Sequence, residues 1–161
     1  MDFCYTISKY DPTFYVNGIF VKDEWTDFSD IGKIFDNKEL TREEYEKTEN
    51  NYINFIVSIL DFINVHKLKI SDLEIYTSVQ WKNVQTIPVS KLPELIRDCL
   101  RNNCWCKIHG SEICLCFGFD FYLHLNCNLN YDTVNKISRN NSLFLKHQTI
   151  QCRQSGDGCL R

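Results

Sequence analysis

The spacing of hydrophobic and polar residues predicts most of the regular structure of this chain. Short β-prone runs cover residues 3–7 and 13–22, and the dipeptide Asn17-Gly18 inside the second run is typical of a tight hairpin turn. Apolar residues also alternate over residues 68–75, which predicts one strand or a strand with a bend in its middle. A last apolar run over residues 142–150 predicts a final strand.

Three other segments have the apolar spacing of helices. The first is expected to begin after Thr41, because Thr41 and Glu44 form the sequence pattern of a capping box. Apolar residues then recur every three or four positions up to Ile63. The second helix is expected over residues 90–103 and the third over residues 131–141.

Residues 102–127 read NNCWCKIHGSEICLCFGFDFYLHLNC and contain five of the nine cysteines. Their alternation predicts three strands of an antiparallel meander. If the turns centre on Gly110 and Phe119, one face of the sheet carries the side chains that could bind metal or act as nucleophiles, with Cys106, Cys114 and His124 side by side. The members of this predicted cysteine face are Cys104, Cys106, Cys114, Cys116 and His124. The opposite face is more apolar, so we expect it to form the core.

The order of these elements predicts an α+β protein. We expect a mostly antiparallel sheet, with a C-terminal three-strand meander, packed by about three helices. Residues 1–148 are predicted to form a single domain. Residues 149–161 have no apolar period and are predicted to form a flexible tail.

The predicted cysteine face allows three interpretations. It could hold a zinc ion, although the Cys-x-x-Cys spacing of common zinc sites is absent. Cys114 beside His124 could act as an activated thiolate, with Asp120 as a third member, in a small thiol-dependent enzyme. Most free cysteines pack as small apolar side chains, and we favour this interpretation. We therefore expect no catalytic residue, no metal and no cofactor.

The composition also bears on the cellular location of the protein, and its charge is unevenly distributed along the chain. The start of the chain lacks the basic and apolar regions of a signal peptide, and no apolar run approaches the ~20 residues of a membrane span. We therefore expect a cytoplasmic protein with reduced thiols and no membrane partner. The net charge is −3, but residues 1–80 contain 15 acidic and 8 basic residues, whereas residues 81–161 contain 6 and 10. Because no basic stripe is present, nucleic acid is not an expected partner.

Several segments together resemble a known family. They are ISKYDP (residues 7–12), KDEWTDFSDIGK (22–33), LTREEYEKTENNYI (40–53), WCK (105–107) and FGFDFY (117–122). In these segments the chain resembles bacterial immunity proteins of contact-dependent growth inhibition and polymorphic toxin systems. The resemblance implies a non-enzymatic protein that binds one toxin domain in the cytosol and covers its active site or substrate surface. Many such toxins are nucleases with basic clefts, so it also implies a basic protein partner.

Two acidic clusters, residues 22–30 and 41–49, are candidates for binding such a partner, because complementary charge speeds association and selects partners. Such clusters are also common on a merely solvated surface, and the glutamates of the second cluster favour the start of a helix. Trp25 would be the aromatic anchor of the interface or, alternatively, a core tryptophan. The predicted partner-binding residues are Asp23, Glu24, Trp25, Asp27, Asp30, Glu43, Glu44 and Glu46.

Overall fold

A computed structural model describes residues 3–148; the predicted tail, residues 149–161, lies outside the described residues. Seven strands form one sheet in the order β11-β1-β10-β9-β8-β6-β7, and every neighbouring pair is antiparallel. The meander predicted from the sequence is therefore confirmed as β8, β9 and β10. The strands are β1 (Phe3–Ser8), β6 (Lys67–Ile75), β7 (Thr86–Pro88), β8 (Cys104–His109), β9 (Ile113–Phe117), β10 (Leu123–Cys127) and β11 (Phe144–Gln148).

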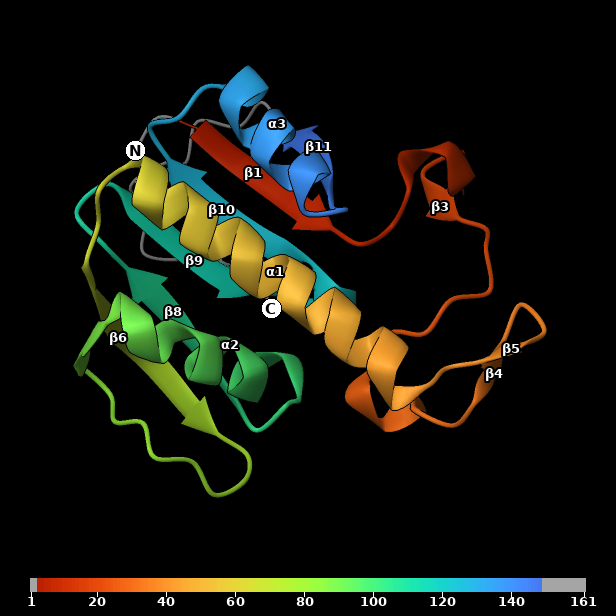
Figure 1. The fold of residues 1–161 in the computed structure, drawn as a ribbon, viewed down its shortest axis with the longest axis horizontal. Coiled ribbons are helices and arrows are strands. Elements are labelled where there is room, and N and C mark those ends of the chain that lie inside the picture. Colours follow the sequence, from red (N-terminus) through yellow and green to blue (C-terminus); the bar gives the residue numbers. More distant parts are fainter. Residues whose placement is uncertain (1–2, 149–161) are drawn as a thin grey trace.

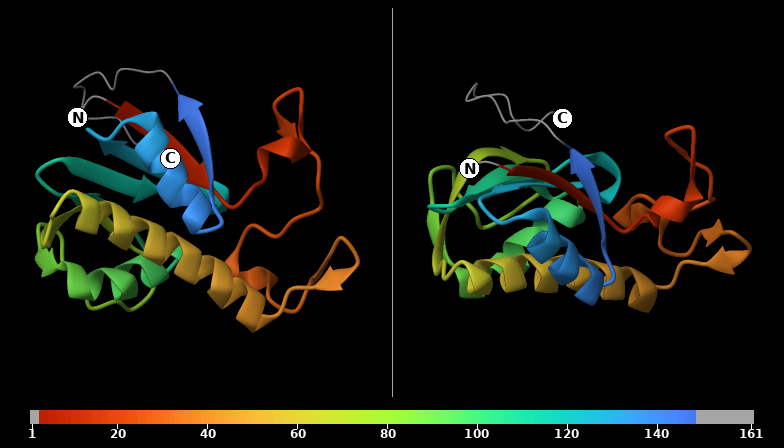
Figure 2. Two further views of the ribbon diagram at one scale, coloured as in Figure 1. Left: turned by 45° about the horizontal axis from the view of Figure 1, so that its top comes forward. Right: turned by 90° about the horizontal axis from the view of Figure 1, so that it is seen from above.

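Three helices cover one face of this sheet, as Figures 1 and 2 show: α1 (Arg42–Phe62), α2 (Leu92–Leu100) and α3 (Tyr131–Asn140). The helix α1 lies between the other two and packs against both. Short 3₁₀ turns precede α2 (Val89–Lys91) and follow β9 (Phe119–Phe121). The α+β class predicted from the sequence is thus confirmed. No helix within residues 3–148 is long and apolar enough to span a membrane.

The start of α1 follows directly from its sequence. The Thr41 hydroxyl accepts a hydrogen bond from the Glu44 backbone N–H, and the Glu44 carboxylate accepts one from the Thr41 N–H, so the predicted capping box is present. Tyr45, Tyr52 and Ile59 are fully buried, because they share the stripe that faces the sheet. The helix is therefore fixed at its N-terminus by its cap and along its length by packing.

The core lies between the helices and the sheet. One row of paired positions crosses five strands from Tyr5 through Leu125, Leu115 and Ile108 to Ile70. Each of these five side chains is at most 2% exposed. Since alternate residues of a strand face opposite sides of a sheet, this row identifies the helix-covered face.

The register between β8 and β9 differs from the prediction. Lys107 pairs with Cys116, and the chain turns at Ser111 and Glu112 rather than at Gly110. A Cβ at Gly110 would lie 2.8 Å from a side-chain carbon of Ile113, so glycine is needed there for close packing and not for the turn. Relative to the prediction, the pairing of β8 with β9 is shifted by an odd number of residues. The β8 side chains that were expected to share a face with Cys114 and Cys116 therefore lie on the opposite face of the sheet.

The predicted cysteine face is therefore wrong. Cys104 and Cys106 lie on the helix-covered face, whereas Cys114, Cys116 and His124 lie on the opposite, outer face. The second turn is displaced by an even number of residues, so His124 keeps its face but pairs with Cys116 instead of Cys114. The three residues predicted to lie side by side, Cys106, Cys114 and His124, are not brought together.

Residues 11–41, here called the N-terminal lobe, extend beyond the end of the sheet (Figure 1, right). Two small hairpins form it, and both turn residues of each have positive φ, the conformation of a type I′ turn. The Asn17-Gly18 hairpin confirms the prediction, and the second hairpin turns at Asp36-Asn37. The elements of the lobe are Pro12–Phe14, β2 (Tyr15–Val16), β3 (Ile19–Phe20), Phe28–Asp30, β4 (Ile34–Phe35) and β5 (Lys38–Glu39).

Candidate functional site

The N-terminal lobe is attached to the sheet through Lys9, which follows β1. The Lys9 ammonium lies 3.0 Å from a carboxylate oxygen of Glu24 and 3.7 Å from the centroid of the Trp25 ring. Trp25 in turn packs on Tyr45 of α1 and on Phe121. Burial lowers the pKa of Lys9 from 10.5 to about 8, against the opposing influence of Glu24. Lys9 thus contacts the lobe through an ion pair and a cation–π interaction, which do not fully offset the cost of burying its charge.

The β2–β3 hairpin presents one apolar face to solvent. Val16 and Ile19 are paired across the hairpin and are 54% and 68% exposed. Tyr15 and Phe20 form the other pair and face the body, where the Tyr15 hydroxyl lies 2.6 Å from the Tyr122 hydroxyl. A two-stranded ribbon can bury only one of its faces, so its second apolar face remains uncovered.

Three more exposed apolar residues belong to the lobe. The side chains of Phe14, Val21 and Ile34 are also exposed, so five of the twelve large exposed hydrophobic residues within the described chain fall between positions 14 and 34. Contiguous apolar surface rimmed by charge is typical of protein interaction sites. The lobe is therefore the strongest candidate for a docking surface.

Most of the predicted partner-binding residues have structural roles in the folded protein. Asp30 is buried and accepts hydrogen bonds from the backbone N–H groups of Thr26 and Asp27, and Trp25 is only 8% exposed, as its alternative interpretation required. Of the eight predicted residues, two are exposed. The eight are Asp23 (exposed), Glu24 (paired with Lys9), Trp25 (buried), Asp27 (capping the Phe28–Asp30 turn), Asp30 (buried), Glu43 (exposed), Glu44 (in the capping box and paired with Lys38) and Glu46 (paired with Arg42).

The apolar face of the hairpin was missed although its signal is in the sequence. The run YVNGIF places two apolar residues on each side of Asn17-Gly18 without alternation. In a two-residue hairpin this pattern makes both faces apolar, and a hairpin outside the main sheet must leave one of them exposed.

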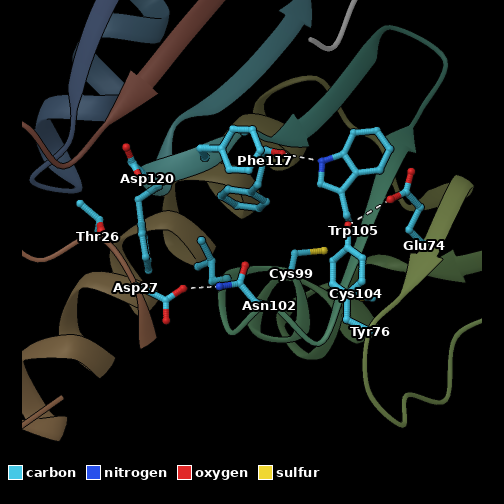
Figure 3. A pocket seen from close by; sticks show the side chains of 14 residues that line it. Thr26, Asp27, Glu74, Tyr76, Cys99, Asn102, Cys104, Trp105, Phe117 and Asp120 are labelled. Carbon is cyan, nitrogen blue, oxygen red and sulfur yellow. Dashed lines mark hydrogen bonds between the residues drawn. The ribbon is translucent and has the colours of Figure 1, made fainter. Parts of the chain in front are cut away.

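A cavity of about 600 Å³ opens where the base of the lobe meets the sheet (Figure 3). Within residues 3–148, its wall combines five aromatic side chains with three carboxylates and contains no lysine or arginine. Asp27 and Asp120 lie at one end of the view and Glu74 at the other, beside Trp105. The residues come from four separate parts of the chain, so only the folded protein assembles this site.

The turn after β9 shapes the rim of the cavity. Asp120 and Phe121 have φ values of 54° and 63°, which are unusual for residues other than glycine. Phe121 is held in the core, and its carbonyl oxygen accepts a hydrogen bond from the Tyr52 hydroxyl at 2.5 Å. Phe119 is consequently left 74% exposed. Two consecutive left-handed residues cost conformational energy, and such strain is concentrated at functional sites.

Three thiols lie together beneath the cavity. The sulfur atoms of Cys99 and Cys106 are 3.8 Å apart, and Cys104 is close enough to hydrogen-bond Cys99. These neighbouring thiols, together with burial, raise the pKa of Cys99 well above its usual value. Cys99 therefore remains protonated, and the three buried side chains pack as small apolar groups.

The outer face of the sheet contains no activated thiol–histidine pair. Burial raises the pKa of Cys114 and lowers the pKa of His124, so both groups are neutral near pH 7. Cys4 and Cys116 take part in disulfide bonds, at odds with the expectation of reduced thiols throughout. No group of three or more His, Cys, Asp or Glu residues suited to a metal ion occurs within residues 3–148.

Comparison of the chain with protein families, with curated proteins and with solved structures finds no match.

Proposed function

We propose that this protein is an immunity protein that binds a basic toxin domain through its N-terminal lobe and covers the toxin's active site or substrate surface. The observation that carries the proposal is the uncovered apolar face of the β2–β3 hairpin, which belongs to an acidic lobe. The resemblance of short segments to bacterial immunity proteins supports the same function.

The exposed apolar residues supply the binding energy on this proposal. Burying a Val or Ile side chain contributes about 1.5–3 kcal/mol, and Val16 and Ile19 are each more than half exposed in the unbound protein. A stable complex buries about 1,600 Å² in total, so the hairpin forms the centre of the interface rather than the whole. The rest of the interface is formed by the rim of the cavity around Phe119 and by the first turns of α1.

Charge selects the partner. The lobe contains seven acidic and three basic residues, a balance of −4, whereas the whole chain has a net charge of −3. A nuclease needs a basic cleft to hold phosphate, so an acidic lobe is complementary to the surface it must cover. Asp23 and Glu43 are the exposed members of the predicted set and are suited to this contact.

The test is binding to a cognate toxin domain, which is to be sought in the reading frames next to this one. The double variant Val16→Ser/Ile19→Ser should weaken binding by about 10- to 100-fold in titration calorimetry, since truncating central apolar residues costs on the order of 1–3 kcal/mol. The charge-reversal variant Asp23→Lys/Glu43→Lys should slow association and reduce its salt dependence. Both variants should also lose protection in a growth assay with the toxin expressed.

Phe62→Ser is the matched control, because Phe62 is 62% exposed at the opposite end of α1 from the lobe. It should leave affinity and protection unchanged. If the hairpin variant stays folded by circular dichroism and binds as tightly as the control, the lobe is not the docking surface. Absence of any binding by the unmodified protein would refute the proposed function itself.

A further inference from the structure

We propose that the cavity between the lobe and the sheet is a receptor for an arginine side chain presented by the partner protein. This inference rests on the proposed function, because it names the part of the toxin that enters the cavity. Its ligand chemistry can nevertheless be tested without any toxin.

The charge of the cavity wall selects a cation. Asp27, Glu74 and Asp120 line it, and no basic side chain does. Asp27 already accepts hydrogen bonds from the Ser29 N–H and the Asn102 side chain, and Glu74 accepts one from the Tyr76 hydroxyl. Asp120 is exposed and makes no hydrogen bond or ion pair within residues 3–148, so it is the carboxylate most available to a ligand.

The aromatic wall favours arginine over lysine. Tyr76, Trp105 and Phe119 belong to the wall, and Tyr76 and Phe119 are 57% and 74% exposed. A planar guanidinium stacks on such rings and donates paired hydrogen bonds to a carboxylate, whereas a compact ammonium does neither as well. The Trp105 ring is fixed in orientation, because its Nε1–H donates to the Phe117 carbonyl oxygen at 2.6 Å.

The size of the cavity indicates a side chain on a loop rather than a free amino acid. At about 600 Å³ it falls within the range of pockets that hold drug-sized molecules, and it is larger than one arginine side chain needs. The flanking backbone of a protein loop would occupy the remaining space. Because the lobe forms one side of the cavity, docking of a basic protein on the lobe brings its loops to the entrance.

The probe is the capped pentapeptide Gly-Gly-Arg-Gly-Gly, with the isosteric but neutral citrulline peptide and the lysine peptide as comparisons. Each is titrated into the full-length protein, and the indole N–H signal of Trp105 is followed by NMR after assignment by its loss in Trp105→Phe. The arginine peptide should give a saturable shift, the lysine peptide should bind about 2- to 5-fold more weakly, and the citrulline peptide should not saturate.

Asp120→Asn should weaken binding of the arginine peptide about 3- to 5-fold, and Asp132→Asn, an exposed acid on α3, should leave it unchanged. Equal shifts with arginine and citrulline peptides, or equal affinities of the two variants, would overturn the inference. If the arginine peptide fails to bind while the toxin domain still binds through the lobe, the inference is wrong and the proposed function stands. If the arginine peptide binds but no toxin domain does, the cavity still recognises arginine and the proposed function is wrong.

Discussion

Replacing Lys9 by methionine tests how the lobe is attached. The Lys9 ammonium is surrounded by the Trp25 ring, the Tyr10 ring and the Glu24 carboxylate, and the side chain is only 8% exposed. Methionine has a similar length and fills the same space without a charge. The substitution therefore isolates the cost of burying the ammonium.

The structure gives the size of the effect. Burial lowers the pKa of Lys9 from 10.5 to about 8, and each pH unit of such a difference corresponds to about 1.4 kcal/mol, so the charged form is disfavoured by about 3 kcal/mol. Because the folded-state pKa lies below the unfolded value, the unfolded chain binds more protons between about pH 8 and pH 10.5. The free energy of unfolding should therefore rise across this interval, whereas at pH 7 the full cost of the charge is present.

The assay is urea unfolding followed by tryptophan fluorescence at pH 7, 8, 9 and 10. At pH 7, Lys9→Met should be more stable than the unmodified protein by about 2–3 kcal/mol, and the difference should shrink as the pH rises. Ionisation of tyrosines near pH 10 affects both proteins and cancels in the difference. A difference that does not change from pH 7 to pH 10, or a variant that is less stable at pH 7, would refute this description of Lys9.

Two further predictions concern the body of the protein. Glu49 is 1% exposed and accepts two hydrogen bonds of 2.8 Å from Arg101. Glu49→Gln should therefore lower the free energy of unfolding by about 2–3 kcal/mol. The control Glu46→Gln, which removes the charge from an exposed ion pair, should change it by less than about 0.5 kcal/mol. Burial lowers the pKa of both His109 and His124, so stability should be lost as the pH falls below about 6.5, the unfolded value. Urea midpoints at pH 7, 6 and 5 measure this loss of stability, and His124→Gln should reduce it. If that variant has the same pH dependence as the unmodified protein, protonation of His124 does not contribute to the loss.

Local signals in the sequence predicted the elements, and packing decided how they combine. The capping box at Thr41 and the turn at Asn17-Gly18 depend on neighbouring residues alone, and both were predicted correctly. The register between β8 and β9 was not, because Gly110 marks a close approach to Ile113 rather than the turn. Sequence alone does not distinguish these two uses of glycine.

The docking surface stays a prediction. It was expected in residues 22–30 and 41–49, and the first of these clusters lies in the lobe, where five of the twelve large exposed hydrophobic residues of the described chain are found. Two of the candidate carboxylates stabilise local structure: Glu44 belongs to the capping box that the sequence predicted, whereas the capping box of Asp30 was not predicted. The cavity could not be predicted, since its wall joins residues near positions 27, 75, 100 and 119 that only the strand order brings together.

Hydrogen exchange of the protein with and without a cognate toxin domain tests the central claim most directly. The account predicts that binding slows exchange in residues 14–25 and 34–40 of the lobe and in residues 117–122 at the cavity, with little change in α3 or on the outer face of β8 and β9. Protection confined to the outer face of the sheet, or no protection in a stoichiometric mixture, would contradict it.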